Sequence, residues 1–131
     1  MEKQMAFTMM LTRGVITAQE KNTAMEAAKL MDENNIGAVA ILKDEKLVGI
    51  VSERDIVRRV VATGKDPQKT IVAEFMTKNV TTANFEDGLD NIYKMLCTVK
   101  FRHLPIMQNG KLVGIASQRD LLYGLKPKDI K

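Results

Sequence analysis

The chain has 131 residues, of which 45% are hydrophobic and 27% are charged, and its formal net charge is +4. This composition excludes a disordered chain and indicates a globular one, about the size of one domain. The positive charge is dispersed, so it does not indicate a nucleic-acid-binding stripe. The sequence shows neither an apolar run of about 18 residues nor a signal peptide, and we expect a cytoplasmic protein.

The chain has one cysteine, Cys97, and one histidine, His103. One cysteine cannot form an internal disulfide, and the position of Cys97 on an apolar helix face predicts a small buried side chain. A single Cys and a single His are too few ligands for a zinc site. Because the sequence contains no nucleophile–base pair, we expect neither a metal site nor an enzyme.

A ten-residue stretch occurs twice. KLVGIVSERD at 46–55 returns as KLVGIASQRD at 111–120, identical at eight of ten positions. The offset of 65 holds without gaps from 11–57 onto 76–122. Such self-similarity indicates the duplication of one structural unit. We predict repeat one at about 8–62, a linker at about 63–74 and repeat two at about 75–126, forming a single module over 1–131.

Each repeat begins with a predicted extended piece and a helix. The extended pieces are 15–17 and 80–82, and Asn22 and Asp87 are the expected helix N-caps. Apolar residues at helical spacing then form one stripe in each copy. These stripes are Ala24, Ala27, Ala28 and Met31 in the first copy, and Leu89, Ile92, Tyr93 and Leu96 in the second.

Two strands and a last helix complete each repeat. We predict strands at 38–42 and 47–51, and at 103–107 and 112–116, with Asn109-Gly110 as a strong hairpin turn. The last helix follows Ser52 or Ser117, and its predicted apolar lining in repeat one is Val57, Val60 and Val61. The predicted fold class is α/β (α+β), with two tandem β-α-β-β-α repeats packed about a pseudo-twofold axis.

The repeated Ser-x-x-Asp motif has two interpretations. A serine followed three residues later by an acid is a capping box, in which Asp55 bonds back to the Ser52 amide. A helix N-terminus after a strand is also suited to a phosphate, and a carboxylate there can accept hydrogen bonds from a ribose diol. Arg54 and Arg119 would place a cation beside each aspartate.

The residues together resemble a CBS-domain pair, also called a Bateman module. The resemblance is carried by GIVSERD and GIASQRD, by IGAVAI and RHLPI in the preceding strands, and by FMTKNVTT at the entrance of the second unit. It covers about 11–125. It implies a regulatory module that binds adenosine-containing ligands between the repeats, with Asp55 and Asp120 on the ribose hydroxyls and Ser52 and Ser117 on ribose or phosphate.

The resemblance also implies which residues surround each ligand. Asp120, Ser117 and Ile115 would face Thr12, Gly14, Ile16, Ile36 and Gly37, while Asp55, Ser52 and Ile50 would face Thr77, Thr81 and Phe101.

The two repeats differ where the resemblance implies phosphate contacts. Arg102 and His103 match phosphate-holding positions, and an arginine grips phosphate through its planar fork. The alternative is that His103 is a half-packed residue at a strand start. Repeat one has Gly37-Ala38 at these places, and Ala40 where repeat two has Pro105. We therefore expect the Asp120 site to bind phosphate better.

Three functions remain open at this point. The first is a sensor of AMP, ADP, ATP or a related molecule, acting on a regulated partner protein and requiring no cofactor. The second is a ligand-free structural dimerisation module, with a homodimer expected and the Met-rich start MEKQMAFTMML as a contact surface. The third, nucleic-acid binding, depends on the net charge of +4 and on Arg58 and Arg59, which are more typical of a solvated helix face, and aromatic stacking residues are nearly absent.

Overall fold

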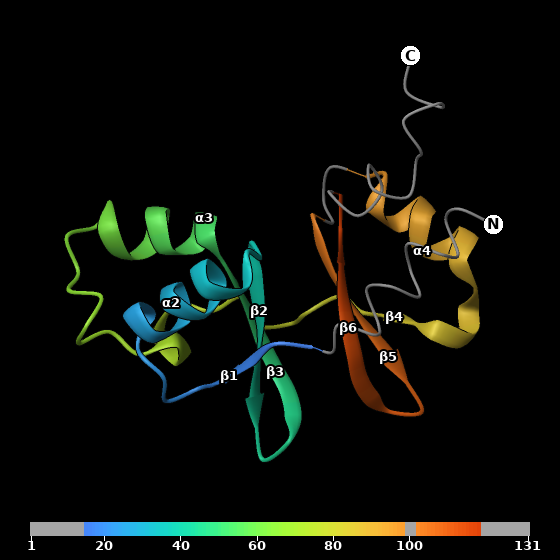
Figure 1. Cartoon of the computed structure of the whole chain (residues 1–131), viewed down its shortest axis with the longest axis horizontal. Coiled ribbons are helices and arrows are strands. Elements are labelled where there is room, and N and C mark those ends of the chain that lie inside the picture. The colour runs from blue at the N-terminus through green and yellow to red at the C-terminus, as the bar shows by residue number, and fades with distance from the viewer. Residues whose placement is uncertain (1–14, 99–101, 119–131) are drawn as a thin grey trace. The chain divides into compact units, whose positions relative to one another are not determined.

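The computed structural model describes residues 15–98 and 102–118, which divide into two compact units. The first unit spans residues 16–80, and the second holds the described residues from 81 onward together with Val15. Each unit contains one three-stranded sheet with helices (Figure 1). This confirms the predicted mixed fold, while the pseudo-twofold packing and the single module stay predictions.

The first unit is a β-α-β-β sheet followed by a helical segment. Its sheet has the order β1-β2-β3, with β1 parallel to β2 and β2 antiparallel to β3. Helix α2 crosses over between the two parallel strands and lies on the same face as α3 (Figure 1). The elements are β1 (Thr17–Gln19), α2 (Ala24–Asn34), β2 (Ala38–Lys43), β3 (Lys46–Ser52), α3 (Glu53–Asp55), the π-helix η1 (Ile56–Val61) and the 3₁₀-helix η2 (Val72–Glu74).

The second unit repeats this topology in the order β4-β5-β6. Its elements are β4 (Ala83–Asn84), the 3₁₀-helix η3 (Phe85–Asp87), α4 (Leu89–Leu96), β5 (His103–Gln108) and β6 (Lys111–Ser117). Both initial strands begin two or three residues later than predicted. Thr17 pairs with Ala40 in the first sheet, but β4 pairs only with Ile106 and Met107. Pro105 stands at the position of Ala40 and has no N–H to donate, which explains the shorter strand.

The duplicated sequence produces duplicated irregularities. The register between β2 and β3 shifts at Ile41/Leu42, and that between β5 and β6 shifts at Ile106/Met107. These two places are 65 residues apart, which is the offset of the repeat. A bulge of this kind bends a strand and changes its twist. The two hairpins therefore carry the same irregularity at matching positions.

Two sequence predictions about helix caps are wrong. The N-cap of α2 is Thr23, which forms a capping box with Glu26, whereas Asn22 accepts a hydrogen bond from the Gln19 N–H at 2.7 Å. The N-cap of α4 is Gly88, because Asp87 belongs to η3. Gly88 stands 65 residues after Thr23 and has no side chain, so α4 begins without a side-chain cap.

The predicted lining of the last helix in repeat one is also wrong in part. Ile56 and Val60 are buried, whereas Val57 and Val61 are 59% and 60% exposed. The wider turn of a π-helix changes which side chains face inward from those of an ordinary α-helix. The predicted counterpart in repeat two, from residue 119, lies outside the described residues.

Cys97 is exposed and forms the C-cap of α4, so the prediction of a buried thiol is wrong. The apolar stripe of α4 ends at the buried Leu96, and the next residue turns away from the core.

Each unit has its own hydrophobic core. The stripe of α2 packs on the first sheet around Val39, Ile41 and Val51, as its helical spacing predicts. Val72, from the end of the predicted linker, and Phe75 and Met76, which follow it, complete this core. The second core contains Ile92 and Leu96 from α4 with Leu104, Ile106 and Ala116 from the sheet.

Candidate functional site

The Ser-x-x-Asp motif of repeat one lies where β3 passes into α3. The Asp55 N–H donates to the Ser52 Oγ at 3.1 Å, and the Ser52 N–H donates to the Asp55 Oδ2 at 2.9 Å. Both bonds of the predicted capping box are therefore present. The box fixes the Asp55 carboxylate at the first turn of the helix, where the helix dipole favours negative charge.

The start of β2 lies beside this junction. Ala38 is opposite Ser52 in the antiparallel register, and the Glu53 N–H donates to the Gly37 carbonyl at 2.9 Å. Gly37, Ser52 and Asp55 are thus brought to one end of the first sheet. Arg54 is exposed on the same turn.

Arg59 also contacts this junction, which the sequence interpretation missed. Its Nε lies 3.7 Å from the Asp55 Oδ1, and its Nη1 donates to the Phe75 carbonyl at 2.8 Å. The prediction of a solvated helix face holds only in part for Arg59. Its side chain is 52% exposed, but it also makes these two contacts. The i,i+4 spacing from Asp55 to Arg59 was the available signal.

The segment that enters repeat two adds Thr77 to the first unit. Ile50 and Thr77 form an antiparallel bridge on the outer edge of β3. Gly49 permits this approach, because a Cβ at this position would lie 2.5 Å from the Met76 Sδ and 3.0 Å from the Thr77 carbonyl oxygen. Ile50 and Thr77 are therefore adjacent, and their expected role around a ligand stays a prediction.

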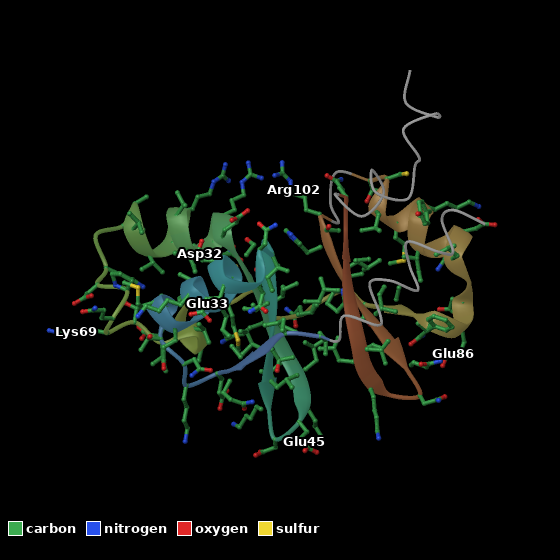
Figure 2. All side chains as sticks on the ribbon, viewed as in Figure 1. Asp32, Glu33, Glu45, Lys69, Glu86 and Arg102 are labelled. Carbon is green, nitrogen blue, oxygen red and sulfur yellow. The ribbon has the colours of Figure 1, made fainter. Side chains whose placement is uncertain are left out.

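The second unit builds the same junction from different side chains. His103 is opposite Ser117, Pro105 is opposite Ile115, and the Gln118 N–H donates to the Arg102 carbonyl at 3.2 Å. This end of the second sheet therefore carries an arginine and a histidine beside the serine, where the first sheet carries Gly37 and Ala38. Figure 2 shows Arg102 at the start of β5.

Gln118 has a further role that the sequence did not reveal. Its side-chain amide donates to the Leu96 and Thr98 carbonyls, both at 3.2 Å. These bonds satisfy carbonyl groups at the C-terminal end of α4. Repeat one has Glu53 at the corresponding position, and a carboxylate cannot donate such bonds.

The remaining predicted site residues have different placements. Ile16 and Ile36 are partly buried against the first core, and Thr81 is exposed. Five predicted site residues lie outside the described residues, and their roles stay predictions: Thr12, Gly14, Phe101, Arg119 and Asp120.

Over 15–98 and 102–118, the chain contains no cluster of three or more His, Cys, Asp or Glu side chains that could hold a metal ion. Within the same residues, no helix has the length and apolar character of a membrane span.

The CBS-domain family model matches residues 8–62 and 72–126. The chain belongs to the CBS-domain family. It carries two CBS domains in tandem, which confirms the resemblance inferred from the repeated motifs. A CBS pair is typically a regulatory, ligand-binding module, and CBS-domain proteins of this kind are generally not enzymes.

Several proteins are similar over most of this CBS pair. An uncharacterized protein of Methanopyrus kandleri is 40% identical over 84% of the chain, and the chain spans only 57% of that protein. The CBS domain-containing protein YhcV of Bacillus subtilis is 34% identical over 85% of this chain and 79% of its own length. A CBS-domain containing protein of Agrobacterium tumefaciens is 33% identical over 82% of this chain and 86% of its own, with a TM-score of 0.73.

Two further similar structures are described with a bound metal or as an oligomer. Hypoxic Response Protein I carries two coordinated zinc ions, and it is 27% identical with a TM-score of 0.72. A CBS-CP12 protein from bloom-forming cyanobacteria is hexameric, and it is 32% identical with a TM-score of 0.72.

Proposed function

We propose that this CBS pair is a regulatory module that senses an adenosine-containing nucleotide such as AMP, ADP or ATP. The observation that carries the proposal is the repeated junction at the end of each sheet, where a serine ends one strand beside the start of the neighbouring strand. A backbone hydrogen bond closes this junction in both units, from Glu53 to Gly37 and from Gln118 to Arg102.

The chemistry of the junction suits a nucleoside phosphate. The Asp55 carboxylate supplies acceptors for ribose hydroxyls, and Asp120 is its counterpart in the sequence. Serine hydroxyls and N–H groups at the helix start suit phosphate oxygens. A change in the bound nucleotide would regulate a partner protein only if the module's two states bind it with different affinity.

The second repeat supplies the stronger phosphate site. Arg102 and His103 lie at the end of β5 that faces Ser117, and an arginine binds phosphate with charge-assisted hydrogen bonds. Gly37 and Ala38 offer no cation at the matching place. Nucleotides with phosphate should therefore bind through Asp120, Ser117 and Arg102 before the first repeat is filled.

A thermal-shift panel tests the proposal. AMP, ADP, ATP, S-adenosylmethionine and NAD are compared with GTP on the wild-type chain and on Asp120→Ala. A ligand at about 100 times its Kd adds roughly 2.7 kcal/mol to stability, which raises the Tm by several degrees. An adenosine-specific rise that becomes much smaller in Asp120→Ala is expected, and no rise in the wild type at millimolar ligand would contradict the proposal.

A ligand-free dimerisation module is the second candidate, favoured by the exposed Val57 and Val61. These valines are one i,i+4 step apart on η1, so they form an exposed apolar pair. Sedimentation of the wild type and of Val57→Asp/Val61→Asp measures how much this apolar pair contributes to a homodimer. A homodimer that the wild type forms and the double variant loses, with no nucleotide effect on the Tm, would favour this function. A wild type and a variant that are both monomers would exclude it.

A further inference from the structure

Arg59 holds the Asp55 carboxylate from within its own helix. The Asp55 Oδ2 accepts the Ser52 N–H at 2.9 Å, and the Asp55 Oδ1 lies 3.7 Å from the Arg59 Nε. Both oxygens are therefore already engaged, and the Asp55 side chain is only 17% exposed. A ribose diol that uses this carboxylate as its acceptor must share it with Arg59 or displace the guanidinium.

The guanidinium is anchored at its other end as well. Its Nη1 donates to the carbonyl of Phe75 at 2.8 Å, and Phe75 is buried in the first core. The backbone two residues further is fixed to β3 by the Ile50–Thr77 bridge. Arg59 thus connects Asp55 to a backbone segment that is itself attached to β3. This attachment keeps the arginine in place.

The second repeat has no arginine at the corresponding position. An offset of 65 maps Ser52, Arg54 and Asp55 onto Ser117, Arg119 and Asp120, and it maps Arg59 onto Gly124. The duplication therefore preserves the Ser-x-x-Asp motif and its neighbouring arginine but not the arginine four residues after the aspartate.

We propose that Arg59 is a positioning residue that restrains Asp55 and weakens the first repeat's half-site for an adenosine ligand, which makes the two half-sites unequal. This inference rests on the proposed function. Its basis is separate from the Arg102 and His103 argument, because it concerns the ribose-binding carboxylate and not the phosphate contacts. Freed from Arg59, Asp55 should bind the ribose more tightly.

Calorimetric titration with AMP tests this in the Asp120→Ala background, where the first half-site is measured alone. Arg59→Gln should tighten AMP binding by about two- to fivefold, the range expected for a partly exposed ion pair. Arg58→Gln is the matched control, because it removes the same charge from the neighbouring exposed residue. Arg58→Gln should leave AMP affinity unchanged or slightly weaker, since it removes only general attraction to phosphate.

The outcomes separate the two proposals. Equal or weaker AMP binding in Arg59→Gln than in Arg58→Gln would overturn the role of Arg59, while AMP binding by the wild type would still support the proposed function. If neither the wild type nor Arg59→Gln binds AMP, ADP or ATP, the proposed function fails and this inference fails with it.

A ligand-free measurement adds an independent arm. Arg59→Gln should lower the Tm by more in the wild-type chain than in Asp55→Asn, because the ion pair exists only in the former. Equal Tm changes in both backgrounds would show that Arg59 does not restrain Asp55, and would overturn the inference without affecting the proposed function.

Discussion

Ile50 and Thr77 exchange two backbone hydrogen bonds, each of 3.0 Å, which fix the entrance of repeat two to β3 of the first unit. The two residues are far apart in the sequence, and the contact makes the segment after the linker part of the first core. The contact depends on the absence of a side chain at Gly49, which lies next to Ile50.

A side chain at position 49 should therefore destabilise the first unit. Gly49→Val is expected to lower the free energy of unfolding by roughly 1–3 kcal/mol, because the added atoms meet Met76 and the Thr77 carbonyl. Urea unfolding measures the change. Met76→Ala should cost less in a Gly49→Ala chain than in the wild type, and equal costs would argue against the close approach.

The two capping boxes of the first unit should contribute similarly to stability. Ser52→Ala and Thr23→Ala each remove the oxygen that accepts the Asp55 or Glu26 N–H. Each substitution is expected to cost about 1 kcal/mol. Ser52→Thr keeps the oxygen and serves as the control in thermal unfolding. A Ser52→Ala chain as stable as the wild type would show that the serine is not an effective cap.

The hairpin turns of the two repeats should respond in opposite directions. Glu45 has a φ of 65°, a region that costs a residue with a side chain about 1 kcal/mol, whereas Gly110 occupies the matching place with a φ of 76°. Glu45 lies at the tip of the first hairpin (Figure 2). We expect Glu45→Gly to raise the Tm and Gly110→Ala to lower it. A lower Tm for Glu45→Gly would mean that its side chain makes a compensating contact.

Glu26 should make stability depend on acid pH. Hydrogen bonds from the Thr23 N–H and the Asn22 side chain hold the pKa of Glu26 below its ordinary value near 4.5. A lowered folded pKa contributes stability above the unfolded pKa, and this contribution is lost as the pH falls through the folded pKa. The stability difference between wild type and Glu26→Gln should therefore shrink as the pH falls from 6 to 3.

Glu33→Gln is the control for this pH series, since Glu33 is an exposed residue of α2 outside the capping box. A pH-independent difference between wild type and Glu26→Gln would contradict the role of the ionised carboxylate.

The repeat in the sequence was sufficient to predict the order of the described elements, the strands near 38–42 and 103–107, and the turn at Asn109-Gly110. Local patterns carry this information, because strand alternation, helical spacing and turn residues act over a few positions. The pattern failed at Val57 and Val61, since α-helical spacing does not describe a π-helix. It also failed at Cys97, where a helix end decides exposure.

The candidate site could be predicted only as separate motifs. The Ser52–Asp55 box is local, and its spacing identifies it. The attachment of Phe75 to Arg59 and of Thr77 to Ile50 joins residues at least 16 positions apart. Such contacts depend on where the chain returns after the linker, which no local pattern specifies.

The most direct test of the central claim is a titration of the isotope-labelled chain with AMP, followed by amide chemical shifts. Binding at the proposed junctions predicts changes at the amides of Arg102 and Gln118 first, and at those of Gly37 and Glu53 at higher AMP. Absence of any change at millimolar AMP, or changes confined to the hairpin turns at 44–45 and 109–110, would contradict the account of an adenosine-sensing module.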